Sequence, residues 1–314
     1  MEFLTNYGLF LLQAVTIVVA LLITVAGILA LSHKDKPKLK IKALNEKYHE
    51  TQHRLQKKLL DKKQAKKLKK EKMDHSRPKM FVIDFDGDIK ASAVDSLREE
   101  INAILSVATP KDEVVVKVNS PGGIVNGYGL AASQLQRIRN KEIPLTVCVD
   151  KVAASGGYLM ACVANKVLAA PFAIIGSIGV VAQLPNFYRW LKKNNIDIEL
   201  LTAGEYKRTL TMLGPNTDKG RKKFIEDLEQ IHESFKDYVA ENRQQVDIEK
   251  IATGEHWLAK DAFDLRLVDK LGTSDDYIMD SLNSFNVYQI EYHKKPSLVE
   301  KVLKPAAQLL TPFY

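Results

Sequence analysis

Short apolar stretches alternate with helical ones between residues 79 and 171, and this alternation constrains the fold more than any other feature of the chain. Strands separated by helices favour a parallel sheet with crossover helices, so the sequence predicts an α/β fold. A long amphipathic helix at 218–243 and a short strand at 286–293 follow. The predicted strands of the alternating region are 79–89, 112–120, 143–150 and 166–171, and its helices are 92–108, 125–141 and 155–165.

Residues 8–31 form an uncharged, apolar run at the N-terminus. A run of this length is sufficient to cross a bilayer core of about 30 Å. It lacks the basic leading region and the small-residue cleavage site of a secretory signal peptide. We therefore expect one retained transmembrane helix within residues 1–33, in preference to a buried core helix.

The positive charge of the chain is concentrated in the segment that follows this apolar run. Residues 34–73 hold fifteen Lys and one Arg against five acidic residues, a net +11, so residues 74–314 carry a net −2 within the overall +8. A slightly acidic body argues against nucleic acid as its partner. Residues 34–77 are interpreted as a solvated, partly helical Lys-rich spacer, which is also suited to anionic lipid. Basic residues directly after a membrane span favour a cytoplasmic body.

The rest of the chain divides into a globular domain at 78–285 and a C-terminal tail at 286–314, which is available to pack on a neighbouring subunit. Cys148 and Cys162 both lie in apolar runs and are interpreted as small buried hydrophobic residues rather than as a disulfide. The sequence shows no spacing typical of metal ligands. We expect neither a metal nor a cofactor.

Two glycine-rich turns each connect a predicted strand to a helix. In "NSPGG" (119–123), the glycines leave backbone N–H groups open to a bound carbonyl, as in an oxyanion hole. In "AASGGY" (153–158), Ser155 is either the N-cap of a helix or a nucleophile, because several hydrolases place a serine at such a turn. A plain structural turn is the simpler interpretation of each motif alone.

A serine nucleophile requires a base, and no histidine lies between residues 76 and 231. The histidine of a Ser-His-Asp triad would have to come from the later helices, whereas a Ser-Lys dyad needs no histidine. A lysine base has to be neutral, although the pKa of an unperturbed lysine is about 10.4. The residues alone leave Lys151, Lys166 and Lys207 open as the base.

Four motifs in order, "NSPGG", "AASGGYLMACVANKVLA", "GSIGV" and "AGEYKRTL", resemble the signal peptide peptidase A family of membrane serine peptidases, peptidase family S49. The apolar N-terminal run, the Lys-rich spacer and the chain length are closest to the SohB branch. The resemblance covers about residues 79–275 and implies a fold similar to that of the Clp protease and crotonase group. It also implies small or apolar peptide substrates, such as remnant signal peptides, and a homo-oligomeric assembly.

The resemblance assigns roles to individual residues. It implies that Ser155 is the nucleophile and that Lys207, which lies 52 residues later, is its base. Ser177 of "GSIGV" would orient the lysine, and the amides of Gly123 and Gly156 would form the oxyanion hole.

One position departs from the family pattern. The family usually carries glycine in the second position of "LGLVDxLG", and this chain carries Arg266 there. The departure bears on the packing of that loop and not on the chemistry.

The resemblance implies a single-pass protein of the bacterial inner membrane. The charge bias places its body in the cytoplasm, and analogy with the family places it in the periplasm. Two alternatives to a membrane-anchored serine endopeptidase use the same fold: a crotonase-like acyl-CoA enzyme and a non-catalytic membrane scaffold. Coenzyme A binding would favour the first of these, and an unreactive Ser155 would favour the second.

Overall fold

The computed structural model describes residues 2–32, 38–60, 74 and 76–293 of the 314-residue chain. The chain divides into two parts, residues 1–39 with 292–314, and residues 40–291. The first part contains the helix α1 (Glu2–Ser32). The predicted C-terminal tail lies outside the described residues from position 294 onward.

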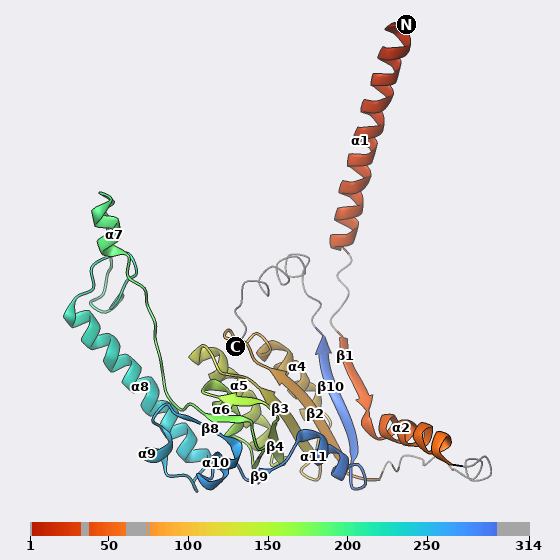
Figure 1. Cartoon of the computed structure of the whole chain (residues 1–314), viewed down its shortest axis with the longest axis vertical. Coiled ribbons are helices and arrows are strands. Elements are labelled where there is room, and N and C mark those ends of the chain that lie inside the picture. The colour runs from red at the N-terminus through yellow and green to blue at the C-terminus, as the bar shows by residue number, and fades with distance from the viewer. Residues whose placement is uncertain (1, 33–37, 61–73, 75, 294–314) are drawn as a thin grey trace. The chain divides into compact units, whose positions relative to one another are not determined.

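The strands and helices predicted between residues 79 and 171 are present in the predicted order (Figure 1). This confirms a mixed α/β fold with parallel strands. In chain order the elements are β1 (Lys38–Ala43), α2 (Leu44–Leu59), β2 (Lys79–Asp86), α4 (Val94–Leu105), β3 (Glu113–Asn119), α5 (Val125–Arg139), β4 (Leu145–Val149), β5 (Val152–Ala154), α6 (Gly156–Ala161), β6 (Lys166–Ala169), β7 (Ile174–Gly176), α7 (Tyr188–Lys193), α8 (Asp218–Asn242), α9 (Ile248–Ile251), β8 (His256–Leu258), α10 (Ala259–Asp264), β9 (Lys270–Leu271), α11 (Ser274–Ser281) and β10 (Asn286–His293).

The main sheet has seven strands in the order β1-β10-β2-β3-β4-β6-β9. From β10 to β9 each neighbouring pair is parallel. Figure 1 shows β10, from the C-terminal end of the chain, beside β2 near its beginning. Parallel neighbours require crossovers, and the helices between the strands supply them.

Side chains of each central strand alternate between two cores. In β2, Phe81, Ile83 and Phe85 face the larger core, which includes buried residues of α4, α5 and α6. Met80 and Val82 face the smaller core, which includes Leu44 and residues of α11. Because both faces of the sheet are covered, its strands are almost continuously apolar, which is the expected pattern for a buried parallel sheet.

A second sheet of three short strands, in the order β5-β7-β8, was not predicted from the sequence. β5 and β7 are parallel, and β7 and β8 are antiparallel. The turn after β3 joins this sheet, because Ser120 pairs with Ala153. The second sheet therefore brings the two glycine-rich turns next to each other.

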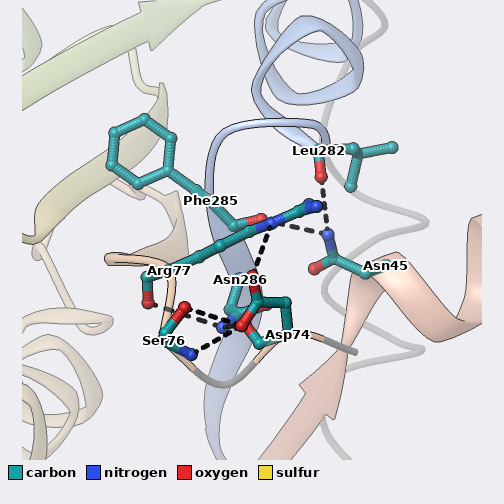
Figure 2. A network of polar contacts seen from close by, with 7 residues as sticks. All are labelled: Asn45, Asp74, Ser76, Arg77, Leu282, Phe285 and Asn286. Atoms are coloured by element: carbon teal, nitrogen blue, oxygen red, sulfur yellow. Dashed lines mark hydrogen bonds and ion pairs between the residues drawn. The ribbon is translucent and has the colours of Figure 1, made fainter. Parts of the chain in front are cut away.

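Part of the predicted Lys-rich spacer forms β1 and α2, and α2 contacts the folded body through Asn45. The Asn45 side chain donates hydrogen bonds to the carbonyls of Leu282 and Phe285, 3.0 Å each, as Figure 2 shows. Its carbonyl oxygen accepts a hydrogen bond from the backbone N–H of Val287, at 2.7 Å. The buried amide therefore has partners for both its donor and its acceptor.

The apolar run 8–31 lies within α1, whose side chains are described for residues 7–22 and 24. Among the described residues, no helix is both long enough and apolar enough to cross a membrane. The structure thus does not support the predicted transmembrane helix.

Candidate active site

Ser155 connects β5 to α6 in a backbone conformation that is rare for a residue with a side chain. Its φ is +50° and its ψ is −118°. Such a conformation costs of order 1–3 kcal/mol and persists only where the surroundings impose it. Here the Ser155 N–H donates to the carbonyl of Gly176 at 2.8 Å, and the Ser155 carbonyl accepts from the N–H of Leu159 at 2.9 Å.

The Ser155 hydroxyl makes no capping hydrogen bond, although the residue occupies the N-cap position of α6. The helix-cap interpretation of this serine is therefore not supported. Its side chain lies in a half-buried position at the end of a strand. A strained strand-to-helix turn with an unused hydroxyl is also the arrangement that presents a nucleophilic serine in many hydrolases.

Ser177 lies beside Ser155 because β5 and β7 are parallel and end together. Ala154 pairs with Gly176, so the two serines each follow one member of the last pair. Ser177 also has a positive φ, +53°, and its N–H donates to the carbonyl of Glu255 at 2.6 Å. Within the described residues no hydrogen bond joins the two hydroxyls.

The "NSPGG" turn contacts the turn that carries Ser155. Gly122 has a φ of +91°, and a Cβ built there would lie less than 3 Å from the N atom of Gly156 and from the Cβ of Ser155. Only glycine has both the conformation and the space that this approach requires. The two glycine-rich turns predicted to cooperate are thus adjacent.

Two backbone N–H groups at this contact are available to a ligand oxygen. The Gly122 N–H is already bonded to the Ser120 hydroxyl oxygen at 3.1 Å. In the described part of the chain, the Gly123 N–H has no acceptor. Gly156 is the first residue of α6, so its N–H has no intrahelical acceptor. These two amides are the ones that the family resemblance assigns to an oxyanion hole.

Lys207 is exposed, and the structure does not bring it to Ser155. It lies between α7 and α8, in a turn where its N–H donates to the Gly204 carbonyl at 3.2 Å. No hydrogen bond among the described residues joins it to Ser155 or Ser177. In Figure 1, α7 and the N-terminal end of α8 lie away from the strands of the main sheet.

The turn that carries Lys207 is docked on the first turns of α8. Glu205 forms an ion pair with Lys219 at 2.5 Å, and the Lys219 ammonium also lies 5.9 Å from the centre of the Tyr206 ring. A Cβ added to Gly220 would lie less than 3 Å from the Thr209 carbonyl oxygen. Residues 204–209 and the start of α8 therefore form one packed unit.

Other ionisable groups have partners or positions that argue against a catalytic role. Lys166, the second candidate base, lies over the Tyr277 ring. Burial raises the pKa of the Cys162 thiol to about 12, so this neighbouring thiol is not a nucleophile at neutral pH. His256 pairs with Gly176 across β7 and β8, which makes it the histidine nearest to the site in strand register.

The comparisons with known proteins agree with the motifs. Residues 2–135 match the description "Peptidase family S49 N-terminal", and residues 137–286 match "Peptidase family S49". A chain of Haemophilus influenzae named "Probable protease SohB" is 47% identical, over 98% of this chain and 94% of that one. A chain of the same name from Buchnera aphidicola subsp. Schizaphis graminum is 46% identical, over 96% and 93%.

Among solved structures, a ClpP1 N165D mutant from Listeria monocytogenes is similar at 15% identity. The match covers 64% of this chain and 94% of that one, with a TM-score of 0.40. The fold itself follows from the strand order and pairing given above. The two family matches and the near full-length identity to SohB proteases together show that the chain belongs to peptidase family S49.

Proposed function

We propose that the chain is a serine endopeptidase in which Ser155 is the nucleophile and Lys207 is the base. The observation that carries the proposal is the Ser155 turn. Ser155 has a positive φ and a hydroxyl that makes no capping hydrogen bond, and it lies beside the available N–H groups of Gly123 and Gly156. A helix cap does not need this strain, and a strained strand-to-helix turn is one way in which hydrolases present a nucleophilic serine.

The reaction follows from these groups. The neutral amine of Lys207 accepts the Ser155 hydroxyl proton while Oγ bonds the substrate carbonyl carbon, and the carbonyl oxygen becomes an oxyanion held by the N–H groups of Gly123 and Gly156. The C–N bond then breaks, and Lys207 passes the proton to the leaving amine. Water, deprotonated by Lys207, then attacks the acyl carbon, the ester C–O bond breaks, and Lys207 returns the proton to the Ser155 oxygen. Ser177 orients the Lys207 amine.

Apolar side chains beside the "NSPGG" turn, which carries the Gly123 amide, support an apolar peptide as the substrate. Ile89 is 71% exposed, Ile124 45% and Val125 53%. Ile89 and Ile124 are joined by a backbone hydrogen bond of 2.9 Å, so they stay next to Gly123. Exposed aliphatic groups at this position suit small or apolar peptides, of which remnant signal peptides are one class.

The exposed position of Lys207 supports assembly into a homo-oligomer. Residues 181–217, the connecting segment between β7 and α8, expose large apolar side chains, among them Val181 at 90%, Trp190 at 62% and Leu201 at 88%. An apolar surface of this kind is typical of a contact between proteins. A second copy that covers the connecting segment would also exclude water from the lysine.

Membrane attachment is proposed on the sequence alone, from the uncharged run 8–31 and the basic residues after it. Carbonate extraction of isolated membranes tests it. Protein that stays with the membrane pellet supports attachment. Protein released to the supernatant contradicts it and agrees with the lack of a qualifying helix among the described residues.

The dyad is tested by cleavage of an apolar fluorogenic peptide. Ser155→Ala and Lys207→Ala should each reduce the rate at least 10³-fold, as loss of a member of a catalytic unit does. His256→Ala should retain activity, because His256 lies near the site in strand register but has no role in the proposed dyad. Full activity in Lys207→Ala, or its loss in His256→Ala, would overturn the dyad.

A further inference from the structure

A row of hydrogen-bonded, buried hydroxyl groups adjoins the "NSPGG" turn. The hydroxyls of Ser120 and Tyr128 are 2.5 Å apart. The Ser120 oxygen also accepts the Gly122 N–H at 3.1 Å, and the Tyr128 hydroxyl donates to the Asp88 carbonyl at 2.8 Å. Ser120 and Tyr128 are both completely buried. The four groups connect the "NSPGG" turn to the loop after β2.

The direction of every bond in this row is determined by its two ends. The Gly122 N–H can only donate and the Asp88 carbonyl can only accept. Ser120 must therefore donate to Tyr128, and Tyr128 must donate to Asp88. Burial raises the pKa of Tyr128, so the phenol stays protonated and keeps its role as a donor. Each hydroxyl donates one bond and accepts one, which leaves no alternative arrangement of the protons.

Tyr128 also contacts the second oxyanion residue. A Cβ built on Gly156 would lie less than 3 Å from the Tyr128 ring. A Cβ on Gly87 would lie equally close to the hydroxyls of Ser120 and Tyr128. Glycine at these two positions lets the backbone of both loops pack directly against the tyrosine. One side chain thus touches the turns of both proposed oxyanion donors, by its hydroxyl on one side and its ring on the other.

We infer that Tyr128, acting through Ser120, is a positioning residue that holds the Gly123 amide at the oxyanion position while its ring sets the place of Gly156. The inference rests on the proposed function, because it presupposes that these amides bind an oxyanion. Using the Gly122 N–H for the bond to Ser120 has a second effect: it leaves the next amide, that of Gly123, as the one available to substrate.

The test is Tyr128→Phe in the full chain, with Tyr158→Phe as the matched control. Tyr158 is equally buried, and its hydroxyl also donates to one backbone carbonyl, that of Leu267 at 3.0 Å. Both substitutions keep the ring and remove one buried hydroxyl. Removing an oxyanion donor outright typically lowers kcat about 10²–10³-fold. Here the donors remain but lose their support, so kcat should fall about 10-fold in Tyr128→Phe.

The readouts separate positioning from general destabilisation. In Tyr128→Phe, KM should stay within about twofold, and affinity for a peptide aldehyde, whose adduct carries an oxyanion, should fall in parallel with kcat. Tyr158→Phe should change neither. Ser120→Ala, which removes the other hydroxyl, should lower kcat similarly, and the double variant should be no worse than the more impaired single one.

The experiment distinguishes failure of the proposed function from failure of the inference about Tyr128. If the wild type shows no cleavage that depends on Ser155, the proposed function is wrong. If the wild type cleaves but Tyr128→Phe matches Tyr158→Phe in kcat and in aldehyde affinity, the inference is wrong and the proposed function stands. If Tyr128→Phe does not fold, Ser120→Ala decides by the same comparison with Tyr158→Phe.

Discussion

A buried ion pair holds the C-terminal end of α8 to the body of the protein. The Arg243 side chain is 2% exposed and makes two hydrogen bonds with the Asp269 carboxylate, of 2.7 and 2.8 Å. It donates a third, of 2.9 Å, to the Arg266 carbonyl. Asp269 also accepts the Val167 N–H at 2.7 Å, which ties the pair to β6.

Asp269→Asn removes the negative charge and leaves the guanidinium buried without its partner. Breaking a buried pair in this way costs about 3–5 kcal/mol. Because the Asp269 side chain is 30% exposed, we expect Asp269→Asn to lower the free energy of unfolding by an amount near the lower limit, about 3 kcal/mol. That is a large share of a typical free energy of unfolding of about 5–15 kcal/mol.

The matched control is Asp227→Asn on the same helix. Asp227 pairs with Lys223 at 2.8 Å, but its side chain is 45% exposed. An exposed pair of this kind contributes about 0.5 kcal/mol or less. The two variants make the same chemical change and differ in burial.

Urea unfolding at pH 7, followed by circular dichroism, measures the difference. Asp269→Asn should lower the midpoint several times more than Asp227→Asn, with an unchanged slope. Replacing both partners, as Arg243→Met with Asp269→Leu, should restore part of the loss, because no charge is then left unpaired. Equal midpoints for Asp269→Asn and Asp227→Asn would refute the reasoning.

Three further outcomes follow from single contacts. Gly220→Ala should lower peptide cleavage by up to about 100-fold, because its Cβ would displace the docked turn that carries the proposed base. Gly129→Ala, with open space around it, should leave cleavage unchanged. Burial raises the pKa of Asp112, but hydrogen bonds from two backbone N–H groups outweigh burial and hold this pKa below its usual value. Asp112→Asn should therefore lower the free energy of unfolding at pH 7, and the loss should shrink as the pH falls through the native pKa of Asp112. Burial raises the thiol pKa of Cys148 and Cys162 to about 12, so iodoacetamide at pH 8 should label both only after unfolding, and labelling of the native protein would contradict their burial.

The alternation of strands and helices could be predicted from the sequence because each element carries its own apolar pattern. The second sheet could not, because β5, β7 and β8 are three residues each, too short to show a period. Its pairing of 174–176 with 256–258 also joins segments about eighty residues apart. The spacer is a similar case: Lys-rich composition did not reveal that residues 38–59 form β1 and α2, which place Leu44 and Asn45 in buried positions.

Arg266 shows what the sequence alone could flag but not explain. Its φ is +61°, a left-handed conformation in which glycine is favoured. This accounts for the glycine that the family usually carries there. The loop keeps this conformation with arginine because the Arg266 carbonyl accepts the Arg243 guanidinium and the Arg266 N–H donates to Phe263 at 2.9 Å.

The candidate site was partly predictable. The family resemblance predicted Ser155, Ser177, Gly123 and Gly156 as site residues, and the structure places them together after the ends of β3, β5 and β7, while their roles stay predictions. The role of Tyr128 was not visible, because a tyrosine on a helix shows nothing of which loops its hydroxyl reaches. Lys207 stays a prediction from the family, since its turn packs on α8 and no contact with Ser155 is present in the described residues.

The most direct test of the proposed mechanism is covalent labelling of the full-length protein by a fluorophosphonate probe, with the modified peptide mapped by mass spectrometry. A serine made nucleophilic by a neighbouring base reacts, and ordinary serines do not. We predict a single adduct on Ser155, none on Ser177 or Ser120, and labelling that is strongly slowed in Lys207→Ala. An adduct on another serine, or equal labelling of the wild type and Lys207→Ala, would contradict the Ser155–Lys207 dyad.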